Sequence, residues 1–492
     1  MFSDPTSGNP MQPITKNIFL KSVFCNTLGW RFRNGKIRTE FSQGQLFRME
    51  QGKEIHRRAR SLYPGGIFVN EPSSPAAAAR TRDLLGNPDT KVLFEATFLA
   101  GNYIAKADIL VRGAGSWELI EVKSSVNAKE ELIDDMAYTT LVAQVAGFSP
   151  SMISLMLIDK KYRLGMPDER LFVKTDMTEQ VLAKVEEFMT VVDHVDFVSS
   201  TPEEPEPELT YNCKQCEYFS ECLGEGVQSH VFDIPRINEE AVERLIALGI
   251  TSIRDIPDSF SLSDNQRRVV ECVRSGTMQV DPSLRQKLER IRLPAFYLDF
   301  ETMMTAIPPW PDIAPYEQIP IQYSLHICES SGNIIRHMDY LADPHRDCRR
   351  ELAERLIEDL KGEGSIITYS SFEKTTISKL STTFPDLSDE LQSLIDRIVD
   401  LEPCIKCINH PEFCGRTSIK IVLPVLVPDL SYEGLEIANG DAALVTFAMM
   451  AQGKMGADEM ERKRAALLEY CTMDTLAMVR LHEVLHGFVP PH

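Results

Sequence analysis

The sequence has little positive charge for its length. Its 492 residues include 52 lysines and arginines against 72 aspartates and glutamates, so the formal net charge is −20. A protein that coats nucleic acid through nonspecific electrostatics is basic, and this balance argues against that class. A nuclease is compatible with the balance, because the carboxylates that hold divalent metal ions make a chain acidic.

The sequence also lacks a long apolar run and a secretion pattern. The longest uncharged stretch includes residues 137–158, and Gln144, Gly147 and Pro150 interrupt it, so we expect a helix, a turn and a strand there and no membrane span. The first residues do not follow the basic, apolar and small-residue order of a signal peptide. An odd number of cysteines, eleven, then favours a reducing, cytoplasmic compartment, where clustered thiols bind metal more often than they form disulfides.

The length and the order of the patterns predict an α/β protein of several domains. At about 150 residues per domain the chain holds about three. Short β-branched and aromatic runs alternate with helical patterns, which is typical of α/β folds. In the N-terminal part we expect strands at 92–94, 104–111, 117–122 and 153–158 and a helix at 131–145. The predicted regions are an N-terminal domain (1–200), an acidic linker with a cysteine-rich segment (201–230), a helical region (231–290) and a C-terminal domain (291–492).

The helical region contains the run LIALGITSIRDIP, which begins at Leu245. It resembles a helix-hairpin-helix element, in which a glycine turn between two short helices offers backbone N–H groups to a phosphate. A plain helical spacer explains the run equally well, and both interpretations stay open.

A first group of chemical residues lies on two predicted strands of the N-terminal domain. Asp108 lies within YIAKADILV, and Glu121 and Lys123 end WELIEVK. Strand side chains alternate between faces, so Glu121 and Lys123 project on the same side, and a hairpin at 113–115 returns Asp108 beside them. Such a group suits metal-dependent hydrolysis of a phosphodiester: the carboxylates hold Mg²⁺ or Mn²⁺, and the lysine orients water and offsets charge. A surface ion pair would explain the three residues taken alone.

Two further residues extend this group in a recognisable order. His56 follows Gly52 in GKEIH, and Gln144 lies on the predicted helix after the ExK strand. The order GxxxH, D, ExK, Q resembles the RecB-like PD-(D/E)XK nucleases, including CRISPR adaptation nucleases that carry an iron–sulfur cluster. The resemblance implies a restriction-endonuclease-like fold, His56 as a further metal ligand and Gln144 as a residue that orients the site. The family usually has a tyrosine four residues after this glutamine, where this sequence has Phe148.

A cysteine cluster follows the acidic linker. YNCKQCEYFSEC supplies Cys213, Cys216 and Cys222, and three thiolates within ten residues of a reduced protein indicate a metal. The resemblance implies that Cys25 is the fourth ligand and that the four hold a structural [4Fe–4S] cluster. Zinc is the alternative, since it also accepts four thiolates.

A second group with near zinc-like spacing lies farther along the chain. It consists of Cys404, Cys407, His410 and Cys414, which follow Pro403 in an expected loop. The segment HPEFCGRTSIK resembles a family phrase in which the histidine and the glycine recur without the cysteines. Whether these four residues bind a metal stays open.

A second constellation of acidic residues lies in the C-terminal domain. FYLDFET places Asp299 and Glu301 on one face of a buried strand, and Glu373 follows another strand. YCTMDTLAMV places Tyr470 and Asp474 four residues apart, on one face of a helix expected at 463–485. Four carboxylates from three segments can surround two divalent ions, which clamp the attacking and leaving oxygens of a phosphodiester.

The order D-x-E, acidic residue, Y-x-x-x-D resembles the DnaQ-like, DEDDy-type 3′→5′ exonucleases. This resemblance implies a ribonuclease H-like fold and a Tyr470 that positions the attacking water. The family has an aspartate where this sequence has Glu373, a longer ligand. Phrases such as YLDFET, AIPPWP and SIKIVLPVL also resemble an uncharacterised module that is fused to RecB-like nucleases; Asp400 and Lys420 belong to its recurring phrases and receive no role here.

Together the two constellations predict a cytoplasmic Mg²⁺- or Mn²⁺-dependent nuclease with two active sites. The expected substrate is DNA with a single-stranded end, with RNA as an open alternative, and analogy suggests a role in repair, recombination or defence. The alternative hypothesis is a nucleic-acid-binding scaffold in which one or both sites are inactive and the iron–sulfur or zinc cluster is structural. Glu373 favours this alternative, because a longer ligand changes the geometry of a metal site.

Overall fold

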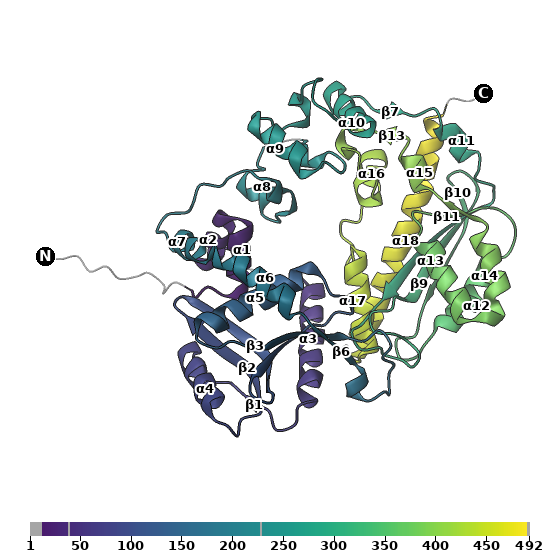
Figure 1. Cartoon of the computed structure of the whole chain (residues 1–492). Helices are drawn as coiled ribbons and strands as arrows, with labels where there is room; N and C mark the ends of the chain where they lie inside the picture. The colour runs from purple at the N-terminus through teal and green to yellow at the C-terminus, as the bar shows by residue number, and fades with distance from the viewer. Residues whose placement is uncertain (1–11, 38–39, 227–228, 490–492) are drawn as a thin grey trace. The chain divides into compact units, whose positions relative to one another are not determined.

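The chain folds into two compact units. A computed structural model describes residues 12–37, 40–226 and 229–489. One unit comprises the chain up to Glu208 together with Thr305–Glu317, and the other comprises Leu209–Met304 and the chain from Gln318 onward. The α/β class is therefore confirmed, with helices and sheets in both units (Figure 1). The unit boundaries differ from the predicted regions, because the cysteine segment and the helical region join the C-terminal part.

The first unit is built on a six-stranded sheet, counted over the described residues, with the strand order β1-β2-β3-β4-β5-β6. Strands β2, β3 and β4 form an antiparallel meander, and β5 pairs parallel to β4. The helix α5 crosses between β4 and β5, as a parallel pair requires. The strands are β1 (Ile67–Phe68), β2 (Val92–Ala100), β3 (Tyr103–Arg112), β4 (Trp117–Val122), β5 (Met152–Ile158) and β6 (Phe172–Asp176).

The helices of the first unit bury their apolar faces against this sheet. On α5, Tyr138 is fully buried, and its ring lies 5.1 Å from that of Phe19 on α1. Phe188 on α6 lies 4.9 Å from the same Phe19 ring, so three helices share one aromatic contact. The helices are α1 (Lys16–Phe24), α2 (Asn26–Arg33), α3 (Gln43–Ser61), α4 (Ser74–Gly86), α5 (Glu130–Val145), α6 (Thr178–Met189) and α7 (Val192–Ser199).

The segment Thr305–Glu317 is an unexpected part of the first unit. Its Tyr316 hydroxyl donates to the Ser124 carbonyl at 2.8 Å, and its Ala306 N–H donates to Gln51 Oε1 at 2.6 Å. Ala306 also packs in the same hydrophobic cluster as Ile55 and Ile120. The sequence prediction assigned this segment to the C-terminal domain, because nothing in its composition marks a change of unit.

The second unit contains a five-stranded sheet among its described residues, with the order β10-β9-β8-β11-β12. Strands β8, β9 and β10 form an antiparallel meander, whereas β11 runs parallel to β8 and to β12. The strands are β8 (Ala295–Met303), β9 (Ile319–Ser330), β10 (Asn333–Leu341), β11 (Ile366–Thr368) and β12 (Ile398–Asp400). A short antiparallel pair of β7 (Gln279–Val280) and β13 (Ile408–Asn409) lies outside this sheet.

The long helix α18 (Ala457–Gly487) packs along β8 and β9 (Figure 1). Its inward face buries Ala477, Leu481 and Leu485, so the helix fixes the position of the residues that it carries against the sheet. The other helices of the C-terminal part are α11 (Leu284–Leu288), α12 (Arg349–Asp359), α13 (Phe372–Thr383), α14 (Ser388–Ile395), α15 (Glu402–Ile405), α16 (Ile419–Leu426) and α17 (Gly440–Ala451).

The helical region has its own hydrophobic cluster, built around Val242, Ile253 and Val273. It contains α9 (Glu239–Ala247) and α10 (Asp264–Ser275). Gly249 has a φ of +71°, which confirms a left-handed glycine turn after α9. The second half of the expected hairpin is a three-residue 3₁₀ turn at Ile253–Asp255 rather than an α-helix.

Among the helices of the described residues, none combines the length and the apolar character that a bilayer crossing demands.

Candidate functional site

Three carboxylates form one row across the sheet of the first unit. Asp108 on β3 lies opposite Glu121 on β4, because the neighbouring pair is Ile109 and Ile120. On the other side, the pairs that flank Asp108 place it opposite Glu95 on β2. Directly opposite side chains of antiparallel strands lie about 4.5–5.5 Å apart at Cβ. The predicted neighbourhood of Asp108 and Glu121 is therefore confirmed, and Glu95 is added to it.

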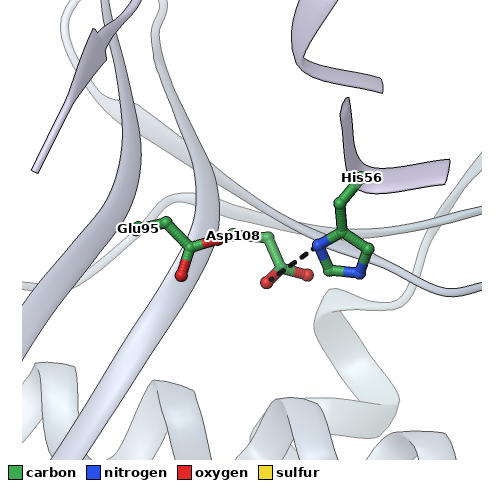
Figure 2. Close-up of side chains that lie close together, drawn as sticks. All are labelled: His56, Glu95 and Asp108. Atoms are coloured by element: carbon green, nitrogen blue, oxygen red, sulfur yellow. Dashed lines mark ion pairs between the residues drawn. The ribbon is translucent and has the colours of Figure 1, made fainter. Parts of the chain in front are cut away.

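His56 reaches this row from helix α3. Oxygen and nitrogen atoms of His56, Glu95 and Asp108 all lie within 4.8 Å of one another, and His56 Nδ1 is 3.7 Å from Asp108 Oδ1 (Figure 2). Glu95 has a φ of 56°, the left-handed region, although it lies inside a strand. Such a conformation is uncommon outside glycine and costs of order 1–3 kcal/mol. The group is a candidate metal centre with one nitrogen and two carboxylates.

Two lysines neutralise the third carboxylate of the row. Lys123 Nζ lies 3.0 Å from Glu121 Oε1 and 2.5 Å from Asp135 Oδ2. Lys16, on α1, lies 3.2 Å from each of the same two oxygens. Glu121 is only 2% exposed, and within the described part of the chain its Oε2 has no hydrogen-bond partner. A buried carboxylate oxygen without a donor is costly, so it suits a cation.

The pKa values of Asp108 and Glu121, two carboxylates of this row, shift in opposite directions. Burial, and then the charge of Glu121, raises the pKa of Asp108 well above its usual value. Burial also acts to raise the pKa of Glu121, but Lys16 and Lys123 outweigh it and lower that pKa. Burial lowers the pKa of His56, which keeps its ring neutral and able to bind a metal near neutral pH. Glu121 is thus the fixed anion of the site.

The structure does not bring Gln144 to this row. Asp135 is the α5 residue that contacts Lys123, and Gln144 lies nine residues farther along the same helix. At 1.5 Å and 100° per residue, this separates them by about 13 Å and half a turn. Phe148 instead stacks on Phe98, with ring centroids 5.1 Å apart. The prediction for Gln144 came from motif order alone, which does not fix the helical phase.

The second candidate site lies between β8 and α18. Oxygen atoms of Asp299, Glu301 and Asp474 all lie within 4.8 Å of one another. Asp299 and Glu301 share a face of β8 because they are two residues apart, and Asp474 comes from the buried face of α18. Glu301 also approaches the first residue of α17, Gly440, and the N-terminus of a helix favours negative charge. The predicted convergence of these three residues is confirmed.

Burial raises the pKa of each acid in the second site, and repulsion from neighbouring acids adds to this at Asp299, Glu301 and Glu373. Burial, and then the charge of Asp474, raises the pKa of Glu301 to about 8. Burial raises the pKa of Glu373 to about 7 and that of Asp474 to about 6. Burial and the other acids raise the pKa of Asp299 well above its usual range. The opposing cation is Lys420, which lowers the pKa of Glu301 and Asp474 without offsetting burial.

Glu373 joins this second group from the first turn of α13. It is 3% exposed, and its charge acts on Asp299. Among the residues described, Glu373 Oε2 has no hydrogen-bond partner. Like Glu121 Oε2 in the first site, this buried oxygen lacks a donor, and a bound cation would compensate for that.

Two tyrosines hold Asp474. The Tyr432 hydroxyl donates to Asp474 Oδ1 at 2.5 Å, and hydrogen bonding from Tyr470 also acts to lower the pKa of Asp474. Lys420 Nζ lies 6.0 Å from the Tyr432 ring centroid and 5.9 Å from that of Tyr470. Sequence reasoning missed Tyr432, because it lies in a loop and no spacing ties it to Asp474.

The predicted cluster ligands divide between the two units. Three of these cysteines lie in the second unit: Cys213 in the turn Tyr211–Gln215, Cys216 directly after it, and Cys222 at the end of the short helix α8 (Phe219–Cys222). The Cys216 N–H donates to the Cys213 carbonyl at 3.2 Å, which folds this segment back on itself. Cys25 belongs to the first unit, between α1 and α2. The four-cysteine ligand set stays a prediction.

The second cysteine group does not converge on one point. Cys404 and Cys407 are buried in the cluster under α18, whereas Cys414 is buried in the cluster of the helical region. Lys287 Nζ donates to Cys407 Sγ at 2.9 Å, and the His410 ring accepts from the Glu412 N–H at 3.2 Å. Local partners therefore hold Cys407 and His410.

Comparison with known proteins relates the chain to a family model and to a bacterial protein. Residues 296–418 match a family model described as a domain of unknown function, DUF2779. The chain is also 23% identical over 227 residues to the "Uncharacterized protein MG366 homolog" of Mycoplasma pneumoniae. That similarity covers 42% of this chain and 34% of the Mycoplasma protein, so the chain spans about a third of the length of that relative.

Proposed function

We propose that the protein is a metal-dependent nuclease with two active sites, which acts on DNA at single-stranded ends. One observation carries the proposal. Two separate groups of half-buried or buried residues each gather three metal-binding side chains within 4.8 Å. Beside each group, among the described residues, a buried carboxylate oxygen has no hydrogen-bond partner: Glu121 Oε2 at the first and Glu373 Oε2 at the second. Acidic side chains are rarely buried unless they are paired or bind metal, so two such groups require a common explanation.

The donor set of each site fits a hard divalent cation. In the first site, His56, Glu95, Asp108 and Glu121 would hold Mg²⁺ or Mn²⁺; in the second, Asp299, Glu301, Glu373 and Asp474 would do so. When bound, such ions neutralise phosphate charge and supply a nucleophilic water near neutral pH. Oxygen-rich ligands and the absence of cysteine from both groups favour these ions over soft metals.

The residues of the first site divide the remaining work. Lys123 is held by Glu121 and Asp135 with its ammonium group beside the row of carboxylates. In that position it can orient a water molecule and stabilise negative charge that develops on a phosphate. The raised pKa of Lys123, which Glu121 and Asp135 produce against the effect of burial, keeps the group charged throughout the physiological pH range.

In the second site, two tyrosines and Lys420 surround Asp474 and influence its pKa. Burial and then the charge of Asp474 raise the pKa of Tyr470, so its hydroxyl stays protonated and can donate to or position a water. The Tyr432 hydroxyl fixes one oxygen of Asp474. This arrangement supports the assignment of Tyr470 as the residue that positions the attacking water.

The strand orders support the proposal at the level of the fold. In the second unit a meander of three strands is followed by two parallel strands, in the order β10-β9-β8-β11-β12, as in ribonuclease H-like proteins. In the first unit the carboxylates lie on a meander followed by a parallel crossover, which agrees with a RecB-like PD-(D/E)XK nuclease. A fold does not establish an activity, so the argument rests on the two sites. We further propose that Cys25, Cys213, Cys216 and Cys222 hold a structural [4Fe–4S] cluster, with zinc as the alternative.

Cleavage assays with variants of each site test the proposal. Anaerobically purified protein is incubated with end-labelled single- and double-stranded DNA and RNA, in Mn²⁺ or in EDTA. We expect cleavage in Mn²⁺ only, partial loss in Lys123→Ala or Asp474→Ala, and complete loss in the double variant. Cleavage that persists in EDTA, or in the double variant, contradicts the proposal. An iron–sulfur absorbance that is absent in Cys216→Ala distinguishes iron from zinc.

A nucleic-acid-binding scaffold is the second candidate function, and one feature of the first site favours it. Lys16 and Lys123 together balance Glu121 and Asp135, so this part of the site needs no metal for charge neutrality. A scaffold binds DNA ends without cleaving any of the substrates in Mn²⁺. The same assay therefore separates the two candidates.

A further inference from the structure

The second unit contains a polar cavity that takes no part in the two acidic groups. Its volume is about 980 Å³, and its walls come from the helical region on one side and from residues 402–417 on the other. The two walls meet at Gly415, whose φ is +73° and where an added Cβ would lie 2.3 Å from Pro235 Cγ. Only glycine fits this conformation and this approach, so the shape of the cavity depends on it.

The cavity is lined by more positive than negative side chains. Its cations are Arg236, Arg268, Lys406 and Arg416, and its acids are Asp281 and Glu402. This excess stands out in a chain with a net charge of −20. Glu402 and Lys406 pair with each other at 2.8 Å, and Arg416 lies 3.8 Å from Asp233, so the positive excess of the cavity rests on Arg236 and Arg268. The arginines are exposed at the walls and give the cavity a local positive potential.

Two helices also begin at this cavity. Asn238 caps α9 and Ser263 caps α10, and both residues line the walls. Helix N-termini carry a partial positive charge and backbone N–H groups, which adds to the charge of the arginines. An anion would therefore meet positive charge from both side chains and backbone.

The end of strand β12 lies between the cavity and the second acidic group. Glu402 lines the cavity and follows Asp400, the last residue of β12, by two residues. The charge of Asp400 acts on Glu373, so Asp400 lies near the second site. Two residues span at most about 7 Å of chain, which places the cavity near that site within the same unit.

We propose that this cavity binds the sugar–phosphate backbone of the nucleic-acid strand whose end enters the second site. The inference rests on the proposed nuclease function and adds a strand-holding region to it. A volume near 980 Å³ lies at the upper end of the range for ligand sites, which agrees with a segment of more than one nucleotide. Phosphate contacts of this kind position a strand without reading its sequence.

Binding measured without metal tests the inference separately from cleavage. Fluorescence anisotropy of a labelled single-stranded oligonucleotide is recorded in EDTA for wild type, Arg236→Glu/Arg268→Glu and the control Arg336→Glu, an exposed arginine on β10. We expect the double variant to bind at least tenfold more weakly, and the control to bind as wild type does. With two phosphate contacts removed, the slope of log K against log salt should fall by about 1.4. Arg236→Lys/Arg268→Lys should restore most of the affinity, which excludes misfolding as the cause.

The outcomes separate this inference from the proposed function. If the double variant binds as wild type does while wild type cleaves in Mn²⁺, the inference is wrong and the nuclease proposal stands. If binding falls in the double variant but wild type never cleaves, the cavity is a strand site and the nuclease proposal fails. Competition by AMP or inorganic pyrophosphate distinguishes the source of the phosphate. Displacement of the oligonucleotide by micromolar AMP or pyrophosphate would assign the cavity to a free nucleotide and overturn the strand assignment.

Discussion

The two acidic groups of this protein differ in how their negative charge is balanced. In the first, Lys16 and Lys123 lie within 3.2 Å of Glu121 and keep its pKa low. In the second, Lys420 is more remote from the acids, and burial raises the pKa of Glu301 to about 8. A protein can therefore keep a buried carboxylate charged with its own lysines, or leave its charge to be balanced by protons and metal ions.

This difference has a consequence for each site when no metal is bound. In the first site, ion pairs with Lys16 and Lys123 hold the charged Glu121 in place. The second site holds protons at neutral pH, which a divalent cation must displace before it binds. We therefore expect metal binding to depend more strongly on pH at the second site.

The largest expected effect is the loss of second-site cleavage in Asp299→Asn. The substitution removes a carboxylate that lies within 4.8 Å of both Glu301 and Asp474, so one ligand of the proposed ions is lost. Changes in the outer shell of metal sites already cost about 10–100-fold, and we expect a loss of at least about 100-fold. Release of nucleotides from an end-labelled strand measures it, with Asp389→Asn, an exposed acid on α14, as the control. An unchanged rate would show that the second site does not cleave the strand.

A loss of similar kind is expected at the first site in Lys123→Ala. Removal of a positive group beside developing negative charge costs about 10²–10³ in rate. The assay uses a background of Asp299→Asn, so that only the first site contributes. Lys174→Ala is the matched control, because Lys174 pairs with Glu118 at 2.7 Å on the same sheet. If both lysine variants behave alike, Lys123 has no role in the chemistry.

A smaller effect is expected when the tyrosines of the second site lose their hydroxyl groups. Tyr432→Phe removes the hydrogen bond to Asp474 Oδ1 and should lower the rate about 10–100-fold. Tyr470→Phe should lower kcat by a similar amount with little effect on KM, because its proposed role is to position water. A KM effect alone for Tyr470→Phe would assign it to binding. These variants test whether the second site depends on neutral donors as the first depends on lysines.

The pH dependence of stability should distinguish the two sites without any substrate. In EDTA the raised pKa of Glu301, about 8 against 4.5 for the ordinary group, means that the folded protein binds more protons than the unfolded chain between these values. Unfolding free energy therefore falls as pH rises through this range. The lowered pKa of Glu121 acts in the opposite direction, and its contribution is lost as pH falls below about 4.5.

Thermal unfolding in EDTA at pH 6 and pH 8 measures this effect. We expect a melting temperature a few degrees lower at pH 8, since 1 kcal/mol shifts it by about 2–4 °C in a domain of this size. Mn²⁺ should reverse the loss. The variant Glu301→Gln should reduce the pH effect, because one of the acids with a raised pKa is gone. An undiminished pH effect in this variant would show that other groups cause it.

The smallest effect should follow from Lys16→Met, at the lysine of α1 that contacts Glu121. The variant removes one of the two cations that balance Glu121 and Asp135 and leaves Lys123 in place. We expect Mn²⁺ to bind the first site a few-fold more tightly, because one competing positive charge is gone. Titration with Mn²⁺ in the Asp299→Asn background measures the affinity. A weaker affinity would mean that Lys16 supports the site through its structure.

Sequence reasoning was most accurate where one local rule decides the structure. Alternation along β4 and β8 places Glu121 beside Lys123 and Asp299 beside Glu301, and the expected strand at 117–122 matches β4 (Trp117–Val122). The helix spacing of Tyr470 and Asp474 is likewise confirmed by α18. Each of these relations lies within a single helix or strand, so the spacing of the residues in the sequence is enough to predict it.

Other parts of the sites depend on how separate elements meet, and the sequence did not reveal them. Glu95 joins the first site only because β2 is in register with β3, and Lys16 joins it only because α1 packs near α5. Tyr432 reaches Asp474 from a loop. Gln144 follows the order of the motif, but the order does not say which side of helix α5 carries the residue. On this helix it is Asp135 that contacts Lys123.

Mn²⁺ binding to the intact protein tests most directly whether the acidic groups are metal sites. Electron paramagnetic resonance of unbound Mn²⁺ is recorded for wild type, Asp108→Asn, Asp299→Asn and the double variant. We predict two independent classes of site in wild type, with each single variant losing a different class and the double variant losing both. Equal Mn²⁺ binding in wild type and the double variant would contradict the account, as would no binding in wild type at millimolar Mn²⁺.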